Sequence, residues 1–513
     1  MKALFVLCVL AVFCGGQSAE AQHPGDRFFR GVLERRDSLL TGGWEKQHHS
    51  VQPMAVPGPR EKSTADSTHG EKSISIGMTG NLSAGGAMNG NVFSGIAGDH
   101  LGALVQYSGS DRWSASLGYS AVGGIRAGYL KELADSLRII PGAGFARDLG
   151  GDMYLAHYTH GHVGYRAGKY FHFELGKGKH FWGDGYRSLI LSDNANAYPY
   201  FRLTTEVWRI KYTNLWIQLR DISFGQDIRN ARLKYAALHS ISWNISPAVN
   251  LSIYEMVIWQ DRDSTSRRHL DFNYLNPLIF FRPLEYAQGS ADNEILGLGL
   301  RIKANKDLKL YGQLVLDEFK WYEIRRAGGW WANKFGGQLG FTWYNAGTEG
   351  LAIQSEMNFV RPFTYTHGSV VQAWGHLNQA LAHPWGANFF EWVNHVRYDV
   401  GRWSFREEFA WGSFGRDKDT DPDLPGLENY GGNLFRSYSN PVNDYGNKIG
   451  QGLKSAFTFH RFEAVWKISG PFDAEWFVSH TWRFERNDYH RRNDHFLMVG
   501  IRTAGLLSRA EDF

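Results

Sequence analysis

The chain has 513 residues, of which 15% are aromatic and 59 are glycine, and its mean hydropathy is −0.38. Lys and Arg (55) nearly balance Asp and Glu (51), which argues against a nucleic-acid-binding protein with a concentrated basic face. Both cysteines, Cys8 and Cys14, stand near the start, so the rest of the chain must hold its fold without a disulfide.

Residues 1–21 have the pattern of a secretory signal peptide. Lys2 supplies the positive charge, residues 3–16 form a short apolar stretch, and Ala-Glu-Ala at 19–21 is a small-x-small cleavage pattern. We expect cleavage before Gln22 and export of the mature chain. The apolar stretch is too short to remain as a membrane span. A lipoprotein is the alternative, but neither cysteine follows the residue pattern that lipid attachment requires.

Residues 22–72 are predicted to be a separate periplasmic N-terminal segment. Asp26 is suited to cap a short helix through FFRGVLERRDSLL at residues 28–40. The following residues, PMAVPGPREKSTADSTHGEKS, are rich in Pro, Ser, Thr and charge, which indicates an irregular linker.

From Ser73 onward, apolar and polar residues alternate with a period of two, as in β-strands with one wet face and one apolar face. Gly109-Ser110-Asp111 predicts a hairpin turn. The clearest alternating segments are residues 73–79, 103–107, 113–121, 308–317, 335–343, 403–411, 476–484 and 497–501. Many Trp and Tyr residues without an apolar helix are typical of an outer-membrane barrel. We predict an all-β transmembrane antiparallel barrel over residues 73–513, with about 14 to 20 strands of roughly ten residues.

Four stretches mix aromatic rings with Arg, Asp, Asn or His and are unlike ordinary turns. They are KHFWGDGYRSLILSDNANAYPY, DFNYLNPLIFFRPLEYAQGSADN, HLNQALAHPWGANFFE and NDYGNKIGQG. Aromatic rings can stack on sugar rings while amides, carboxylates and guanidinium groups bond to hydroxyls. The same residues suit a plugged barrel lumen, where charges must pair. The residue types alone leave these two interpretations open.

From these stretches we select a set of residues as a polysaccharide-binding or lumen network. It consists of Trp182, Asp184, Arg187, Asp193, Arg282, Glu285, Asp292, Asn293, His383, Trp385, Asn388 and Lys448. The Trp side chains would stack on sugars, and the others would contact hydroxyl or carboxylate groups. Alternatively, Arg187 and Arg282 pair with Asp184, Asp193 or Glu285 as struts across the lumen. The strut role is favoured slightly, because an unpaired charge inside a narrow barrel is costly.

Metal-binding patterns are weak, and we expect neither a metal nor another cofactor. His157, His160, His162, His172 and His180 are close in sequence, and His160 and His162 share a strand face, but polar wall residues are the simpler interpretation. The alternating carboxylates Asp417, Asp419, Asp421 and Asp423 resemble a calcium loop. Pro422 stands where such a loop needs Gly, so a solvated acidic loop is favoured over a calcium site.

No catalytic pattern stands out, and we predict that the protein is not an enzyme. The glycine-lysine run at residues 176–179 lacks the spacing of a phosphate loop. The acid pairs at 317–318 and 407–408 are adjacent residues of strands, which point to opposite faces. No nucleophile elbow or zinc-protease motif is present.

Several blocks of the sequence resemble the Wzi family of outer-membrane capsule-assembly proteins, in particular a branch from gliding bacteria that includes the motility protein RemB. The blocks are FWGDGYRSLILSDNA with YPY, KYTN, KYAALH, YLNPLIFFRPLEY with GSADN, LVLDEF, NKFGGQLGF, RPFTYTH with HLNQALAHPWGANF, and YGNKIGQG. They occur in order from about residue 171 to residue 452.

The resemblance implies a barrel of about 18 strands with a short periplasmic helical N-terminal part. It further implies a lectin-like role in attaching surface polysaccharide, possible links to a motility or secretion assembly, and no catalysis. Two alternatives remain at this point: a porin or transporter for a small solute, and a secreted all-β glycan hydrolase.

Overall fold

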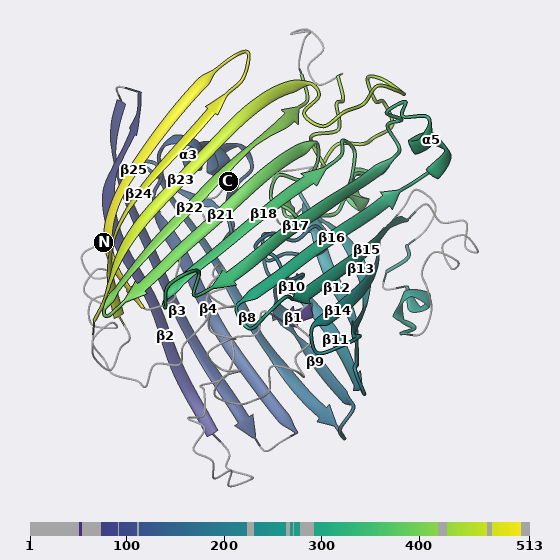
Figure 1. The fold of residues 1–513 in the computed structure, drawn as a ribbon, viewed down its shortest axis with the longest axis horizontal. Helices are drawn as coiled ribbons and strands as arrows, with labels where there is room; N and C mark the ends of the chain where they lie inside the picture. Colours follow the sequence, from purple (N-terminus) through teal and green to yellow (C-terminus); the bar gives the residue numbers. More distant parts are fainter. Residues whose placement is uncertain are drawn as a thin grey trace.

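The computed structural model describes residues 51–53, 73–90, 92–109, 112–222, 230–262, 267–269, 271–277, 292–418, 428–468 and 474–503. Its dominant feature is a closed antiparallel β-barrel (Figure 1). The predicted signal peptide, the predicted N-terminal helix, and Arg282 and Glu285 lie outside the described residues.

In the described residues, eighteen strands form the wall, and each is hydrogen-bonded to the next in chain order. They are β2 (Ser73–Asn89), β3 (Val92–Gly109), β4 (Trp113–Ile125), β8 (Met153–Ala167), β9 (Phe171–Gly178), β11 (Tyr198–Val207), β12 (Ile210–Asp221), β13 (Arg232–Asn244), β14 (Val249–Gln260), β15 (Asn293–Lys303), β16 (Leu308–Glu318), β17 (Lys334–Tyr344), β18 (Leu351–Val360), β21 (Phe389–Val400), β22 (Trp403–Arg416), β23 (Leu453–Lys467), β24 (Ala474–Arg486) and β25 (Arg491–Thr503). The barrel closes where β25 pairs with β2, with Asn81 opposite Arg502. A short strand, β7 (Arg147–Gly150), pairs with the start of β8. The predicted fold class is confirmed.

The two ends of the barrel differ in how the strands are joined. At one end the connections are short: only two residues separate β21 from β22, and Gly401 there has a φ of +60°, which glycine adopts without steric cost. At the other end six connections are long, over residues 126–152, 179–197, 261–292, 319–333, 361–388 and 417–452. Outer-membrane barrels turn their long loops to the outside, so we call this the outer end.

Most of the outer surface of the wall is apolar. Six of the exposed tryptophans lie on the strand ends and turns of the short-turn end, where they form an aromatic girdle: Trp113, Trp208, Trp243, Trp343, Trp403 and Trp476. Outward residues above the girdle, such as Leu117, Leu339 and Leu497, are also exposed. This is the surface of a barrel that lies in a lipid bilayer. Among the described residues, no helix has both the length and the apolar character needed to cross a membrane.

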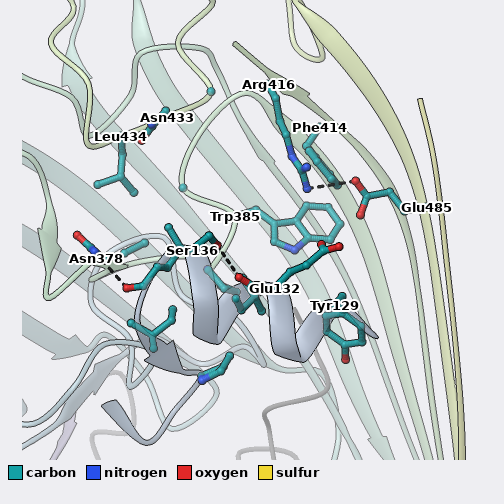
Figure 2. Close-up of a pocket in the computed structure, with 18 of the residues that line it drawn as sticks. Tyr129, Glu132, Ser136, Asn378, Trp385, Phe414, Arg416, Asn433, Leu434 and Glu485 are labelled. Atoms are coloured by element: carbon teal, nitrogen blue, oxygen red, sulfur yellow. Dashed lines mark hydrogen bonds and ion pairs between the residues drawn. The ribbon is translucent and has the colours of Figure 1, made fainter. Parts of the chain in front are cut away.

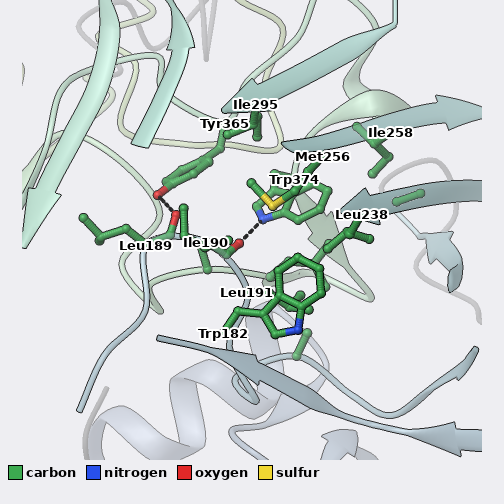
Figure 3. Close-up of a cluster of buried hydrophobic side chains, with 14 of the residues drawn as sticks. Trp182, Leu189, Ile190, Leu191, Leu238, Met256, Ile258, Ile295, Tyr365 and Trp374 are labelled. Atoms are coloured by element: carbon green, nitrogen blue, oxygen red, sulfur yellow. Dashed lines mark hydrogen bonds between the residues drawn. The ribbon is translucent and has the colours of Figure 1, made fainter. Parts of the chain in front are cut away.

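A plug fills part of the lumen and is built from two of the long connections. Residues 179–197 and 361–388 pack against each other and against inward-facing residues of the wall, including Leu215, Leu238 and Met256. Figure 3 shows two hydrogen bonds that join the connections: Tyr365 Oη donates to the Leu189 carbonyl at 2.7 Å, and Trp374 Nε1 donates to the Ile190 carbonyl at 2.9 Å.

Small elements complete the lumen and the outer end. In the plug, β10 (His180–Trp182) pairs with β1 (Val51–Pro53), and β19 (Gly375–His376) pairs with β20 (Gln379–Ala380). The helix η4 (Val370–Gln372) precedes β19. The helix α3 (Gly128–Ser136) is followed by the hairpin of β5 (Ile139–Ile140) and β6 (Gly144–Phe145), and α5 (Trp321–Arg325) lies between β16 and β17.

The connection after β14 lies partly on the outside of the wall. Its short helix η3 (Phe272–Leu275) includes Tyr274, whose carbonyl accepts a hydrogen bond from Trp216 Nε1 at 2.8 Å. Trp216 stacks on Phe201, an exposed residue of the outer face. Residues 271–277 of this predicted stretch therefore cover outward residues of β12 and its neighbours instead of lining the lumen. Asp292 and Asn293, at its other end, bind Gln372 of the plug.

Candidate functional site

The centre of the plug is held by an ion pair that is closed to water. Arg187 donates from Nη2 to Glu391 Oε1 at 3.0 Å and from Nε to Oε2 at 3.3 Å, and the two side chains are 3% and 0% exposed. His383 Nε2 lies 2.8 Å from Glu391 Oε2, and Asn358 Nδ2 donates to the same oxygen. The strut interpretation therefore describes Arg187, although its partner is a residue of β21 rather than Asp184 or Asp193.

A second carboxylate of the wall binds the backbone of the plug. Glu356 on β18 accepts from the N–H groups of Tyr186 and Arg187 at 2.7 and 3.0 Å, and from Tyr311 Oη at 3.0 Å. Gln313 on β16 similarly accepts from the Leu189 N–H at 2.9 Å. These bonds fix the path of residues 183–190 across the lumen, because buried backbone groups without partners are costly.

Trp182 and Asp184 are also structural. Trp182 is 0% exposed and stacks on Tyr254 with ring centroids 5.8 Å apart, so it offers no face to a ligand. Asp184 forms an ion pair with Arg301 at 3.3 Å. Asp193 is buried, and its carbonyl accepts from Lys179 Nζ.

The predicted residues near the outer end also bind within the protein. Asp292 accepts from Arg268, Tyr274 Oη and Gln372 Nε2, and Asn293 Nδ2 donates to the Gln372 carbonyl at 2.9 Å. These contacts tie the start of β15 to the plug.

Two further predicted residues are associated with the last long connection, residues 417–452. Lys448 belongs to this connection, and Asn388 faces it. Asn388 is 0% exposed, donates to the carbonyls of Gly415 and Gln451, and accepts from the Gly450 N–H at 2.8 Å. Lys448 is exposed, and its N–H donates to Gln451 Oε1.

Two histidines of the plug, His376 and His367, are held neutral by their environment. The Arg220 N–H donates to His376 Nδ1 at 3.0 Å, which requires that nitrogen to be unprotonated. Burial, and after it the charge of Lys234, lowers the pKa of His376 to about 3. Burial and the charge of Lys334 lower the pKa of His367 to about 4. The plug therefore excludes charge that is not paired.

Above the plug, a pocket of about 940 Å³ lies at the outer end of the barrel, between α3, the second plug connection and β22, β24 and β25. Figure 2 shows Trp385 at its centre, with Phe414 beside it and Tyr129 on α3 below. The aromatic and polar residues that line it include Tyr129, Glu132, Asn378, Trp385, Phe414, Arg416, Asn433, Phe435, Arg483, Glu485, Arg491 and Arg492. Of the residues selected from the sequence, Trp385 alone is among the lining residues given by the described part of the chain.

Neighbouring rings hold Trp385 in place. Its ring lies 4.9 Å from the ring of Phe457 in an edge-to-face contact, 5.6 Å from Phe389 and 5.3 Å from Phe414. The indole is partly buried, so three rings fix it while part of it faces the cavity. A fixed, partly exposed aromatic face suits stacking on an apolar ring face of a ligand.

Paired charges border this indole. Glu485 accepts from Arg483 at 2.8 Å and lies 3.1 Å from Arg416, whose side chain is 51% exposed. Glu132 on α3 pairs with Arg492, which also binds Asp494 at 2.6 Å. The guanidinium groups of Arg416 and Arg483 thus share the carboxylate of Glu485 on one side of the pocket. Hydrogen-bond donors and acceptors are present on both sides of the pocket.

Sequence reasoning missed α3 and the arginines of β24 and β25. A signal for the helix was present, since Tyr129, Leu130 and Leu133 in GYLKELADS follow helical spacing, and they pack against the inner wall at Phe496. Arg483 and Arg492 occupy inward positions of ordinary strand patterns, so nothing in the local sequence separates them from other lumen residues.

In the two stretches considered for metals, His162 and Asp417 make hydrogen bonds or ion pairs within the protein. His162 bonds to Ser116 Oγ at 2.9 Å, and Asp417 binds Arg436 and the Tyr430 N–H. Asp419, Asp421 and Asp423 lie outside the described residues. Over the ranges that the structure describes, no three His, Cys, Asp or Glu side chains are grouped so that they could hold a metal ion.

Comparison with known proteins gives no match to a family model and none among curated proteins. Among solved structures, the chain is similar to Escherichia coli Wzi, described as an outer-membrane protein involved in group 1 capsule assembly and a carbohydrate-binding β-barrel; identity is 13% over 82% of this chain and 83% of that chain, with a TM-score of 0.50. Pseudomonas aeruginosa OccK8 (OprE) is 10% identical over 84% of this chain and 97% of that chain, with a TM-score of 0.46. Pseudomonas aeruginosa OprD is 12% identical over 83% and 94%, with a TM-score of 0.42. The shared feature is the fold, and the chain is an outer-membrane β-barrel of 18 strands.

Proposed function

We propose that this barrel is a Wzi-like, exported outer-membrane protein that binds surface polysaccharide in the pocket above the plug and catalyses no reaction. The observation that carries the proposal is the position of Trp385: a fixed, partly exposed indole among arginines, carboxylates and amides, at the outer end. The resemblance of the sequence blocks to the Wzi family supports the same role. Export depends on the predicted signal peptide, and a partner in surface motility or secretion is a further expectation from the gliding relatives.

Pocket size and chemistry agree with a saccharide ligand. The volume of about 940 Å³ lies near the upper end of the range of about 300–1,000 Å³ for ligand pockets, which leaves room for more than one sugar ring. The C–H faces of pyranose rings are apolar enough to pack on an indole, and their hydroxyls need the planar donors and acceptors present here.

A porin is the competing function, because a barrel of 18 strands is wide enough to leave an aqueous channel. The plug argues against free passage, since Leu189, Ile190 and Leu191 are all 0% exposed inside the lumen. A secreted hydrolase is disfavoured because most of the exterior of the wall is apolar.

Retention of the cell's own surface polysaccharide on the purified full-length protein tests the proposal. Wild type should retain the polysaccharide, and Trp385→Ala should weaken its retention at least about tenfold, a loss of about 1.4 kcal/mol of binding free energy. Trp343→Ala is the matched control, because Trp343 belongs to the lipid-facing girdle and is 43% exposed. Equal and weak retention by all three proteins would remove the recognition role.

A further inference from the structure

The lipid-facing wall carries a group of polar side chains at mid-height on four neighbouring strands. Glu407 on β22, His460 on β23, His480 on β24 and His495 on β25 all point outward, on the same face as Trp403 and Trp476 of the girdle. We call these four residues the polar ladder.

Contacts join the ladder in pairs. His460 Nε2 lies 3.2 Å from Glu407 Oε1, and His495 Nδ1 lies 3.3 Å from His480 Nε2. Glu407 is opposite Phe462, and Phe462 is opposite His480, so the two pairs are separated by one exposed aromatic residue.

Strand geometry places the ladder inside the apolar band. Glu407 stands four residues above Trp403, and His480 stands four residues above Trp476. Four residues of a strand tilted by about 40° rise about 10 Å from the girdle. The apolar band of such barrels is about 25 Å tall, so these groups face its middle and not a headgroup region.

Further polar residues face outward on strands in and beside the ladder, but the polar surface does not continue onto β2 and β4. Ser355 Oγ and Asn394 Oδ1 are 2.7 Å apart on the outward face of β18 and β21, and Trp482 Nε1 donates to Asn493 Oδ1 at 2.6 Å. The wall of β2 and β4 is different: its outward residues at corresponding heights include Ile76, Met78 and Leu117, which are exposed and apolar.

We propose that the outward face of β21 to β25 is the interface with a second copy of this chain. Ionisable groups that face lipid at mid-depth are energetically costly, and packing against protein removes their contact with lipid. The face is self-complementary, because it carries a carboxylate at its β22 side and imidazoles at its β24 and β25 side. A two-fold axis along the membrane normal keeps each residue at the same membrane depth in both copies. It brings β22 of one copy toward β25 of the other.

The available area suits such a contact. Five strands spaced about 4.8 Å apart make a face about 24 Å wide, and a band about 25 Å tall then gives about 600 Å² per copy. The total of about 1,200 Å² is at the lower limit of stable specific interfaces. Phe409, Phe462 and Trp482 supply apolar surface around the ladder.

Single-cysteine cross-linking of the full chain in native membranes tests the interface. Phe462→Cys places a thiol at the centre of the face, and Leu117→Cys places one at an exposed site on β4 as the matched control. A bifunctional maleimide should give a product with the mass of two chains for Phe462→Cys and none for Leu117→Cys. No product from Phe462→Cys, a product with a different protein, or equal products from both sites overturns the proposal.

The double variant His480→Leu with His495→Leu, made in the Phe462→Cys background, tests the ladder itself. It should retain its heat-modifiable electrophoretic mobility, the mark of a folded barrel, because it removes polar groups from a lipid-facing wall. Cross-linking should fall at least fivefold. Unchanged cross-linking in a folded double variant would show that the ladder does not hold the copies together, and the proposal would fail.

Discussion

Arg187 and Glu391 form an ion pair to which water has no access, 3% and 0% exposed. Removing one partner leaves the other charge buried and unpaired, and this typically costs about 3–5 kcal/mol. Arg187→Ala should therefore lower the stability of the plug by that amount. Hydrogen exchange at the Leu189 amide, which donates to Gln313, measures the effect.

Two variants control for this substitution. Arg486→Ala removes an exposed arginine at the outer end of β24 and should leave exchange at Leu189 unchanged. Arg187→Met with Glu391→Gln removes both charges and should cost less than Arg187→Ala alone. Faster exchange in the double variant than in Arg187→Ala would contradict the assignment of the pair as a strut.

His376 should make the stability of the plug depend on pH. Its pKa is lowered to about 3 by burial, whereas the unfolded chain titrates near 6.5. The folded plug therefore binds fewer protons, and its stability is complete above pH 6.5 and declines as pH falls from 6.5 toward 3. The decline is at most about 1.4 kcal/mol per pH unit from this group.

Hydrogen exchange across residues 374–382, corrected for the intrinsic pH dependence, checks this expectation. His376→Gln keeps an acceptor for the Arg220 N–H and has no titrating ring, so protection should change less between pH 6 and pH 4 than in wild type. An identical pH response in both proteins would assign the effect to other groups, such as His367.

The pairing of β9 with β11 allows the connection of residues 179–197 to be removed. Gly178 at the end of β9 is opposite Tyr198 at the start of β11, so a two-residue Asn-Gly turn can replace the whole connection. Because this segment contributes much of the buried core of the plug, we expect the shortened barrel to conduct ions in planar bilayers while wild type is nearly silent. Heat-modifiable mobility confirms folding of both. Conductance of wild type equal to that of the shortened barrel would show that the plug does not close the lumen.

Strands were predictable because their signal is local. Residues 113–121 and 476–484 alternate as a strand with one lipid face must, and they lie in β4 and β24. The position of the predicted hairpin agrees with the end of β3 at Gly109 and the start of β4 at Trp113, although Ser110 and Asp111 lie outside the described residues. The partners of buried charges were not predictable, because Glu391 is 204 positions from Arg187 and meets it only when the barrel closes.

At the scale of the whole molecule, the barrel combines an apolar exterior, a plugged centre and a pocket that opens at the outer end. Trp385 was selected from its aromatic-polar stretch, but most of the other residues that line its pocket come from α3 and from distant strands and loops. Closure of β25 on β2 brings α3 beside Arg492. The site is therefore a property of the closed barrel and not of any one segment.

Occupation of that pocket by polysaccharide is the central claim, and the labelling rate of a single cysteine at Asn433 tests it most directly. Asn433 is exposed and lines the pocket, whereas Tyr489, 67% exposed on the β24–β25 turn of the same end, does not. With saturating surface polysaccharide from the producing cells, maleimide labelling of Asn433→Cys should slow at least tenfold, and labelling of Tyr489→Cys should stay the same. Equal labelling rates with and without polysaccharide at both positions would contradict the proposed function.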